Sequence, residues 1–142
     1  MGDKAVNIVG FNDQGKLVIG NMTAKQLEEK NMREVVTTVG PNLIVDGKSV
    51  ISGDWGIAPR TGIGQMADGT VIFIVIDGRQ PTWSIGATLS DLAKVFVDYH
   101  AVNAANLNGG SFSDMVYQGK VMNRLCDILG ERYIPTAFVV TS

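Results

Sequence analysis

Residues 102–115 read Val102-Asn-Ala-Ala-Asn-Leu-Asn-Gly-Gly-Ser-Phe-Ser-Asp-Met115, and the rest of the chain is organised around them. The stretch begins as an apolar strand over residues 102–107, breaks at residues 108–111 and resumes over residues 112–117. Two adjacent glycines permit positive φ angles and a close approach of the backbone to a ligand. Asn-Gly is also the strongest short signal for a β-hairpin, so this stretch alone favours a hairpin turn. The alternative is a binding site, because hydrogen-bonding side chains crowd the turn: Asn106, Asn108, Ser111, Ser113 and Asp114.

The hydrophobic pattern on either side of this stretch predicts an α+β fold. Capping-box patterns at Thr23 and Thr88 predict helices over about residues 23–31 and 88–99. Residues 70–76 are apolar at nearly every position, which is typical of a strand buried on both faces. Other apolar runs predict strands over residues 5–11, 16–19, 34–39, 43–45, 48–51 and 136–140. Since strands and helices do not alternate regularly, we expect one domain over residues 1–142 with a mixed, mostly antiparallel sheet.

Composition excludes several classes of function. The formal net charge of −2 leaves no electrostatic footprint for nucleic acid. The longest strongly apolar run, residues 71–76, is too short to span a membrane as a helix, and residues 1–6 lack a signal-peptide pattern. Cys126 and His100 are the single cysteine and histidine, so an internal disulfide is impossible and zinc or Cys–His chemistry is disfavoured.

Three polar clusters stand at the ends of apolar strands, where a sheet holds side chains rigidly. They are Pro59-Arg60-Thr61, Asp77-Gly78-Arg79 and residues 106–111. Arg60, Arg79 and Arg132 are candidate anion ligands, because a guanidinium matches phosphate or carboxylate with two parallel hydrogen bonds. The alternative is structural: each arginine lies at the surface or in an ion pair, and Asp77 holds a turn.

Metal binding is a weaker prediction. Oxygens of Asp77, Asn106, Asn108 and Asp114 suit a hard cation such as Ca²⁺, although their spacing matches no standard motif. The chain also lacks the phosphate-binding G-x-x-x-x-G-K-[ST] loop and the G-x-S-x-G nucleophile elbow.

Taken in order, short segments along nearly the whole chain resemble the phosphodiester glycosidase family. That family includes the animal enzyme that uncovers mannose 6-phosphate and bacterial proteins described as exopolysaccharide-related. The resemblance rests on Gly40-Pro41 with Leu43-Ile-Val-Asp-Gly-Lys48, Pro59-Arg-Thr-Gly-Ile-Gly64, Val75-Ile-Asp-Gly-Arg79, Ser84-Ile-Gly-Ala-Thr-Leu-Ser-Asp-Leu-Ala93, Asn106-Leu-Asn-Gly-Gly110, Met115-Val116, and Asn123 with Gly130-Glu-Arg132.

The resemblance implies hydrolysis of the bond between a sugar's anomeric carbon and a phosphodiester oxygen. It implies a carbohydrate phosphodiester or glycan as partner and an extracellular or cell-envelope location. We expect the catalytic groups to be Asp77, Arg79 and Asn108. We expect substrate and phosphate to contact Arg60, Thr61, Asn106, Gly109, Gly110, Ser111, Ser113 and Arg132.

Departures from the family pattern support an alternative function, a non-catalytic glycan-binding or structural module of a larger assembly. Asn108 stands where family members usually carry aspartate, and an amide neither carries charge nor takes a proton as a base. An upstream Asn-Gly-Gly-Phe-Phe-like segment of the family has no counterpart in the chain. A domain without that segment leaves sheet edges open, so we expect self-association or packing into a larger assembly.

Overall fold

The computed structural model describes residues 4–53 and 55–141. Residues 1–3, which the signal-peptide prediction covers, lie outside the described residues, as do positions 54 and 142. In chain order the elements are β1 (Val6–Asn12), β2 (Leu17–Met22), α1 (Ala24–Glu29), β3 (Met32–Thr37), β4 (Asn42–Val45), β5 (Lys48–Ser49), β6 (Arg60–Met66), β7 (Val71–Ile76), α2 (Leu89–Asp98), β8 (Ala101–Asn106), the 3₁₀ turn η1 (Gly110–Phe112), β9 (Val116–Tyr117) and β10 (Lys120–Val121).

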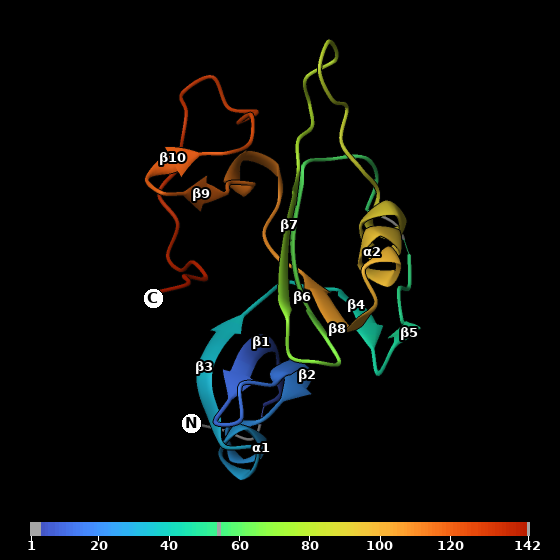
Figure 1. Cartoon of the computed structure of the whole chain (residues 1–142), viewed down its shortest axis with the longest axis vertical. Coiled ribbons are helices and arrows are strands. Elements are labelled where there is room, and N and C mark those ends of the chain that lie inside the picture. The colour runs from blue at the N-terminus through green and yellow to red at the C-terminus, as the bar shows by residue number, and fades with distance from the viewer. Residues whose placement is uncertain (1–3, 54, 142) are drawn as a thin grey trace.

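A central sheet with strand order β5-β4-β8-β6-β7 organises the molecule, and its neighbouring strands pair antiparallel. A smaller antiparallel sheet, β2-β1-β3, lies at the end of the molecule near α1, whereas α2 lies beside the central sheet (Figure 1). The predicted α+β class with a mostly antiparallel sheet and two α-helices is confirmed. Among the described residues, no helix is long and apolar enough to cross a membrane.

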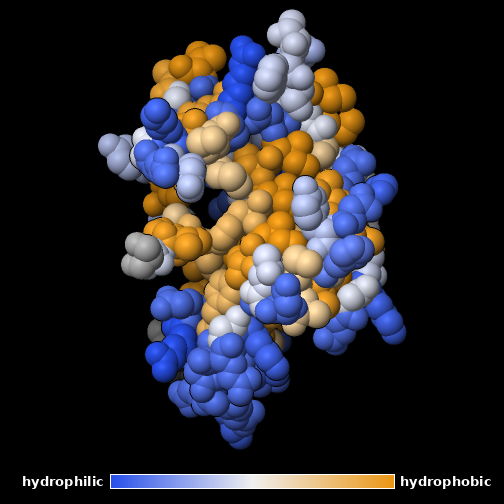
Figure 2. Space-filling model, in the orientation of Figure 1, coloured by the Kyte–Doolittle hydropathy of each residue, from blue (hydrophilic) through white to orange (hydrophobic). Residues whose placement is uncertain are grey.

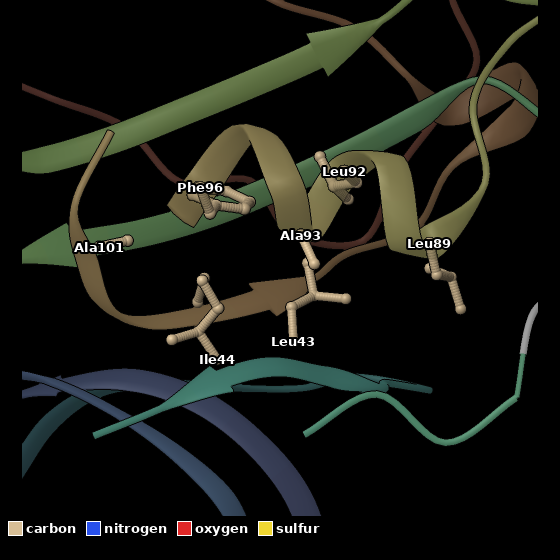
Figure 3. Packing of buried hydrophobic residues seen from close by; sticks show 8 residues of the cluster. Leu43, Ile44, Leu89, Leu92, Ala93, Phe96 and Ala101 are labelled. Carbon is tan, nitrogen blue, oxygen red and sulfur yellow. The ribbon is translucent and has the colours of Figure 1, made fainter. Parts of the chain in front are cut away.

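Helix α2 packs its apolar face onto the central sheet. The spacing of Leu89, Leu92, Ala93 and Phe96 places all four side chains on that face, and all are buried (Figure 3). The Phe96 ring lies against two glycines of β6: a Cβ on Gly62 or Gly64 would stand 2.8 or 2.7 Å from ring carbons. Glycine at these positions therefore lets the helix approach the sheet closely.

A second core fills the space between the two sheets. Its fully or nearly fully buried members are Val9, Leu17, Ile63 and Ala105. Buried Gln65 spans this layer: its Oε1 accepts from the Leu17 amide at 2.7 Å, and its Nε2 donates to two backbone carbonyls, of Gly15 and Gly69, at 2.9 and 3.0 Å. These bonds satisfy a buried polar group and fix how β6 meets the β1–β2 hairpin.

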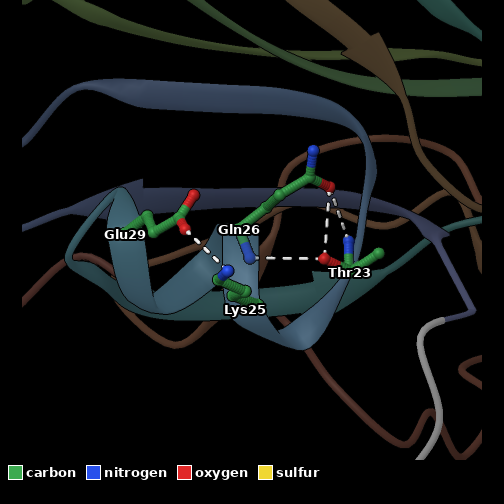
Figure 4. Close-up of polar contacts among 4 residues, drawn as sticks. All are labelled: Thr23, Lys25, Gln26 and Glu29. Carbon is green, nitrogen blue, oxygen red and sulfur yellow. Dashed lines mark hydrogen bonds and ion pairs between the residues drawn. The ribbon is translucent and has the colours of Figure 1, made fainter.

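Both helices begin with the predicted capping boxes. In α1, the Gln26 amide donates to the Thr23 hydroxyl at 3.3 Å, and the Thr23 amide donates to Gln26 Oε1 at 2.9 Å (Figure 4). An exposed Lys25–Glu29 ion pair of 3.8 Å lies one turn further on (Figure 4). These local bonds explain why a six-residue helix without a buried side chain begins where the sequence predicts.

Stability should depend on pH through the capping box of α2. Hydrogen bonds from the Thr88 hydroxyl, then from its amide, lower the pKa of Asp91 below its ordinary value of 3.8. A lowered folded-state pKa stabilises the protein above the unfolded pKa, and this contribution is lost as pH falls through the folded value. We expect the melting temperature of Asp91→Ala to lie below wild type at pH 7 and to approach it as pH falls below 3.8 and through the lowered folded-state pKa.

The control is Asp13→Ala, which removes an exposed carboxylate from the β1–β2 turn. An Asp91→Ala deficit that stayed constant from pH 7 to about pH 3 would contradict the capping contribution.

The structure corrects three sequence predictions. Strand β8 pairs with β4 and β6 and is followed by η1, so the hairpin with residues 112–117 does not form. Residues 136–140 form no strand; instead Phe138 packs edge-on against Phe11 at 6.3 Å between ring centroids. Strand β7 pairs only with β6 and is half-buried rather than buried on both faces. In each case the apolar residues signalled burial, but the chain path decided which neighbours were available.

Polar and apolar surface is unevenly distributed. On the face in Figure 2, hydrophilic residues gather at the end of the molecule formed by α1, and apolar residues run across its middle. The segment after β10 carries exposed apolar side chains at Ile128, Leu129 and Tyr133.

Candidate functional site

The site begins where β8 ends, at Asn106. This side chain is 3% exposed, and its Nδ2 donates to the Gly40 carbonyl at 2.8 Å. Its backbone amide donates to the Pro41 carbonyl at 3.1 Å, and its own carbonyl accepts from the Thr38 hydroxyl at 3.2 Å. Asn106 Oδ1 is buried without a hydrogen-bond partner among the described residues. Asn106 is therefore fixed in place while one acceptor is left over.

The two glycines that follow bring three segments together. A Cβ on Gly109 would stand 2.5 Å from the Pro59 carbonyl oxygen, and the Gly110 amide donates to that oxygen at 3.0 Å. Gly110 has a φ of +66°, and a Cβ there would stand 3.1 Å from Nη1 of Arg79. The double glycine is thus required by close approach to the 59–60 backbone and to the Arg79 guanidinium.

Arg79 is the exposed cation of the site. It follows β7 with a φ of +57°, and its guanidinium lies against Gly110. Within the described part of the chain, no hydrogen bond or ion pair reaches its guanidinium. A guanidinium whose five N–H donors keep no protein acceptor is suited to an anionic ligand.

Arg60 is placed differently. It is 5% exposed, its Nε donates to the Ala87 carbonyl at 3.0 Å, and its Nη2 donates to the Gly56 carbonyl. These bonds join the loop before β6 to the segment that leads into α2. Arg60 therefore stabilises the loop before β6 and also contributes positive charge to the site.

A cleft of about 400 Å³ unites these groups. Eight of the predicted site residues line it, namely Arg60, Arg79, Asn106, Asn108, Gly109, Gly110, Ser111 and Arg132. Thr61, Asp77 and Ser113 do not, and the hydroxyls of Thr61 and Ser113 are buried without a partner among the described residues. The described lining also includes Pro59 and Leu107 from the predicted clusters, and residues that the sequence interpretation missed: Val39, Trp55, Ala58 and Phe112. The sequence signal that could have indicated this part of the lining is a tryptophan, Trp55, between Gly53 and Gly56.

Asp77 lies outside the described cleft lining and binds the carboxy-terminal segment, residues 123–141. Its Oδ2 accepts from the Trp83 indole N–H at 2.7 Å, and its Oδ1 accepts from the Arg124 amide at 3.0 Å and from Asn123 Nδ2 at 3.3 Å. The Arg124 guanidinium also stacks over the Trp83 ring at 5.5 Å. Both carboxylate oxygens of Asp77 are therefore engaged in linking β7 to residues 123 and 124.

The carboxy-terminal segment supplies the second cation of the cleft. Arg132 stacks over Phe112 at 5.8 Å, and its Nε lies 3.2 Å from an Asp127 carboxylate oxygen. Beside it, a hydrogen bond with Asp114 and then the charge of that group raise the pKa of Glu131.

The four candidate Ca²⁺ ligands are dispersed in the structure. Asn106 and Asn108 line the cleft, whereas Asp77 binds the carboxy-terminal segment and Asp114 lies beside Glu131. Over residues 4–53 and 55–141, no group of three or more His, Cys, Asp or Glu side chains is arranged to hold a metal.

Comparison with solved structures shows a shared fold. The catalytic domain of zebrafish N-acetylglucosamine-1-phosphodiester alpha-N-acetylglucosaminidase, auto-inhibited by its pro-peptide, matches with a TM-score of 0.72 and 22% identity, over 85% of this chain and 45% of that one. A hypothetical protein from Synechocystis matches with a TM-score of 0.60 and 17% identity, over 87% and 32%. A putative exported protein from Burkholderia pseudomallei K96243 matches with a TM-score of 0.58 and 23% identity, over 91% and 38%.

Sequence comparison gives the family. The SPbeta prophage-derived uncharacterized protein YomE of Bacillus subtilis (strain 168) is 36% identical over 78 residues, which is 55% of this chain and 12% of YomE. The chain thus spans less than half the length of these relatives. A sequence model described as phosphodiester glycosidase matches residues 1–141. Because that match extends over nearly the whole chain, the chain belongs to the phosphodiester glycosidase family.

Proposed function

We propose that the chain hydrolyses the C1–O bond between a sugar and a phosphodiester, with the cleft beside Gly109 and Gly110 as the site. The observation that carries the proposal is the Arg79 guanidinium, which has no hydrogen-bond or ion-pair partner among the described residues and faces Gly110 in that cleft. Arg132, which is paired with Asp127, and buried Arg60 line the same cleft. Such a cationic pole suits the phosphate of the family's substrates.

The chemistry demands little of a general acid. Water adds its oxygen to C1, the C1–O bond breaks with its electron pair going to the phosphate oxygen, which leaves as a phosphomonoester, and the proton that the water loses passes to the released phosphomonoester or to solvent. A phosphomonoester is a weak base, with a second pKa near about 6, so it departs without strong protonation. The site must instead stabilise negative charge on phosphate, for which Arg79 offers a guanidinium without a partner among the described residues, and position a water, for which Asn108 offers an amide oxygen.

A second function has its own support, a glycan-binding module without catalysis. Asn108 lines the cleft where the family pattern carries aspartate, and the described lining residues include no carboxylate. A cleft with cations, amides and aromatic rings but no acidic side chain binds a sugar phosphate without supplying a base.

Release of free sugar from UDP-N-acetylglucosamine and from a methyl phosphodiester of N-acetylglucosamine 1-phosphate separates these functions. For the hydrolase, we expect turnover by the wild type and a fall in kcat/KM of about 100-fold in Arg79→Ala, because a phosphate contact made in the transition state is lost. Arg33→Ala removes an exposed arginine that does not line the cleft and should leave kcat/KM unchanged.

The other outcomes are equally informative. Sugar release that survives in Arg79→Ala would contradict the assignment of the cleft. A wild type that binds sugar 1-phosphate without turnover, and gains turnover in Asn108→Asp, would identify a binding module descended from an enzyme.

A further inference from the structure

The described lining of the cleft includes two chemically different groups of side chains. Arg79 and Arg132 are cationic, and the Phe112 ring is already stacked under the Arg132 guanidinium. Val39 and Trp55 add apolar surface from two different loops. Trp55 is 53% exposed, so it is accessible to a ligand in the cleft.

Hydrogen bonds anchor the backbone of the loop that carries Trp55. The carbonyl of the next residue, Gly56, accepts a hydrogen bond from buried Arg60, and the amide of Ala58 donates to the Ala87 carbonyl at 3.2 Å. Gly110 in turn donates to the Pro59 carbonyl at 3.0 Å. The backbone of the loop that carries Trp55 is thus tied both to the segment before α2 and to the double glycine that faces Arg79.

We propose that Trp55 is the sugar-ring subsite of the cleft, on which a pyranose stacks while its 1-phosphate meets Arg79. This inference rests on the sugar-phosphate ligand of the proposed function. The C–H face of a pyranose packs on an indole ring, and the hydroxyls at the ring edge need hydrogen-bonding partners. Asn108 and Ser111 line the same cleft and offer an amide and a hydroxyl for them. A ligand with one apolar face, a polar edge and an attached dianion matches the whole cleft.

Equilibrium binding tests the subsite independently of turnover, using N-acetylglucosamine 1-phosphate, inorganic phosphate and uridine monophosphate as probes in calorimetric titrations. Trp55→Ala should lower the affinity for N-acetylglucosamine 1-phosphate about tenfold and leave the affinity for inorganic phosphate unchanged. Trp55→Phe, which keeps a ring, should stay within about threefold of wild type. Arg79→Ala should weaken both ligands. Tyr99→Ala, which truncates an exposed aromatic side chain outside the described cleft lining, is the matched control.

The outcomes separate this inference from the hydrolase. Unchanged binding of N-acetylglucosamine 1-phosphate in a folded Trp55→Ala variant overturns the subsite, even where turnover is intact. If uridine monophosphate binds more tightly than the sugar phosphate and this binding depends on Trp55, the assignment to the sugar is overturned, because Trp55 then stacks on a nucleobase. If N-acetylglucosamine 1-phosphate binds in a Trp55-dependent way but no turnover is seen, the subsite is supported and the proposed hydrolase activity is contradicted. A wild type that binds no probe overturns both.

Discussion

Replacing Phe96 by alanine is expected to lower the free energy of unfolding by about 3–5 kcal/mol, measured by urea denaturation. Phe96 is fully buried between α2 and β6, with its ring against Gly62 and Gly64. Since glycines carry no side chain that can move into the void, the cavity left by the ring would stay open.

Val97→Ala is the matched control, because Val97 is 48% exposed on the same helix and should cost less than about 1 kcal/mol. Gly64→Ala tests the contact from the other side: a Cβ 2.7 Å from the ring should cost about 1–3 kcal/mol by overpacking. Combining Gly64→Ala with Phe96→Leu should cost less than the sum of the single changes. A Phe96→Ala variant no less stable than Val97→Ala would refute the packing account.

Asp77→Ala is expected to detach the carboxy-terminal segment and to lower the free energy of unfolding by about 1.5–3 kcal/mol. The change removes the acceptor for the Arg124 amide, for Asn123 Nδ2 and for the Trp83 indole. Hydrogen exchange of the Arg124 amide should accelerate, and limited proteolysis should cut after residue 122 in the variant before it cuts wild type.

Asp77→Asn distinguishes this holding role from catalysis. The asparagine keeps one acceptor oxygen, so a holding residue should show intermediate protection of the Arg124 amide and partial activity. A carboxylate that takes part in the reaction would instead lose turnover in Asp77→Asn while protection stayed near wild type. Asp13→Ala, at an exposed turn far from these contacts in the sequence, should change neither readout.

The sequence by itself determined the local elements and the family. Each helix begins at a capping residue whose partner lies three positions further on, as for Thr23 with Gln26 and Thr88 with Asp91. Four consecutive residues are therefore enough to predict where each helix begins. The ordered short motifs likewise led to the phosphodiester glycosidase family, which the match over residues 1–141 confirms. The polar clusters around Arg79 and Asn108 also converge on one cleft, because each follows a strand of the central sheet.

Only the tertiary structure decided the partners of these groups. Asp77 contacts Arg124, 47 positions away, and Trp55 reaches the same cleft as Asn108 through a loop that no periodic pattern marks. Strand β7 reads as fully buried yet lies at an edge, and Phe138 packs without a strand around it. Sequence periodicity reports which residues avoid water, a preference that many chain paths satisfy. Which carboxylate holds a segment and which ring lines a cleft depend on contacts between distant residues, and these form only when the chain closes on itself.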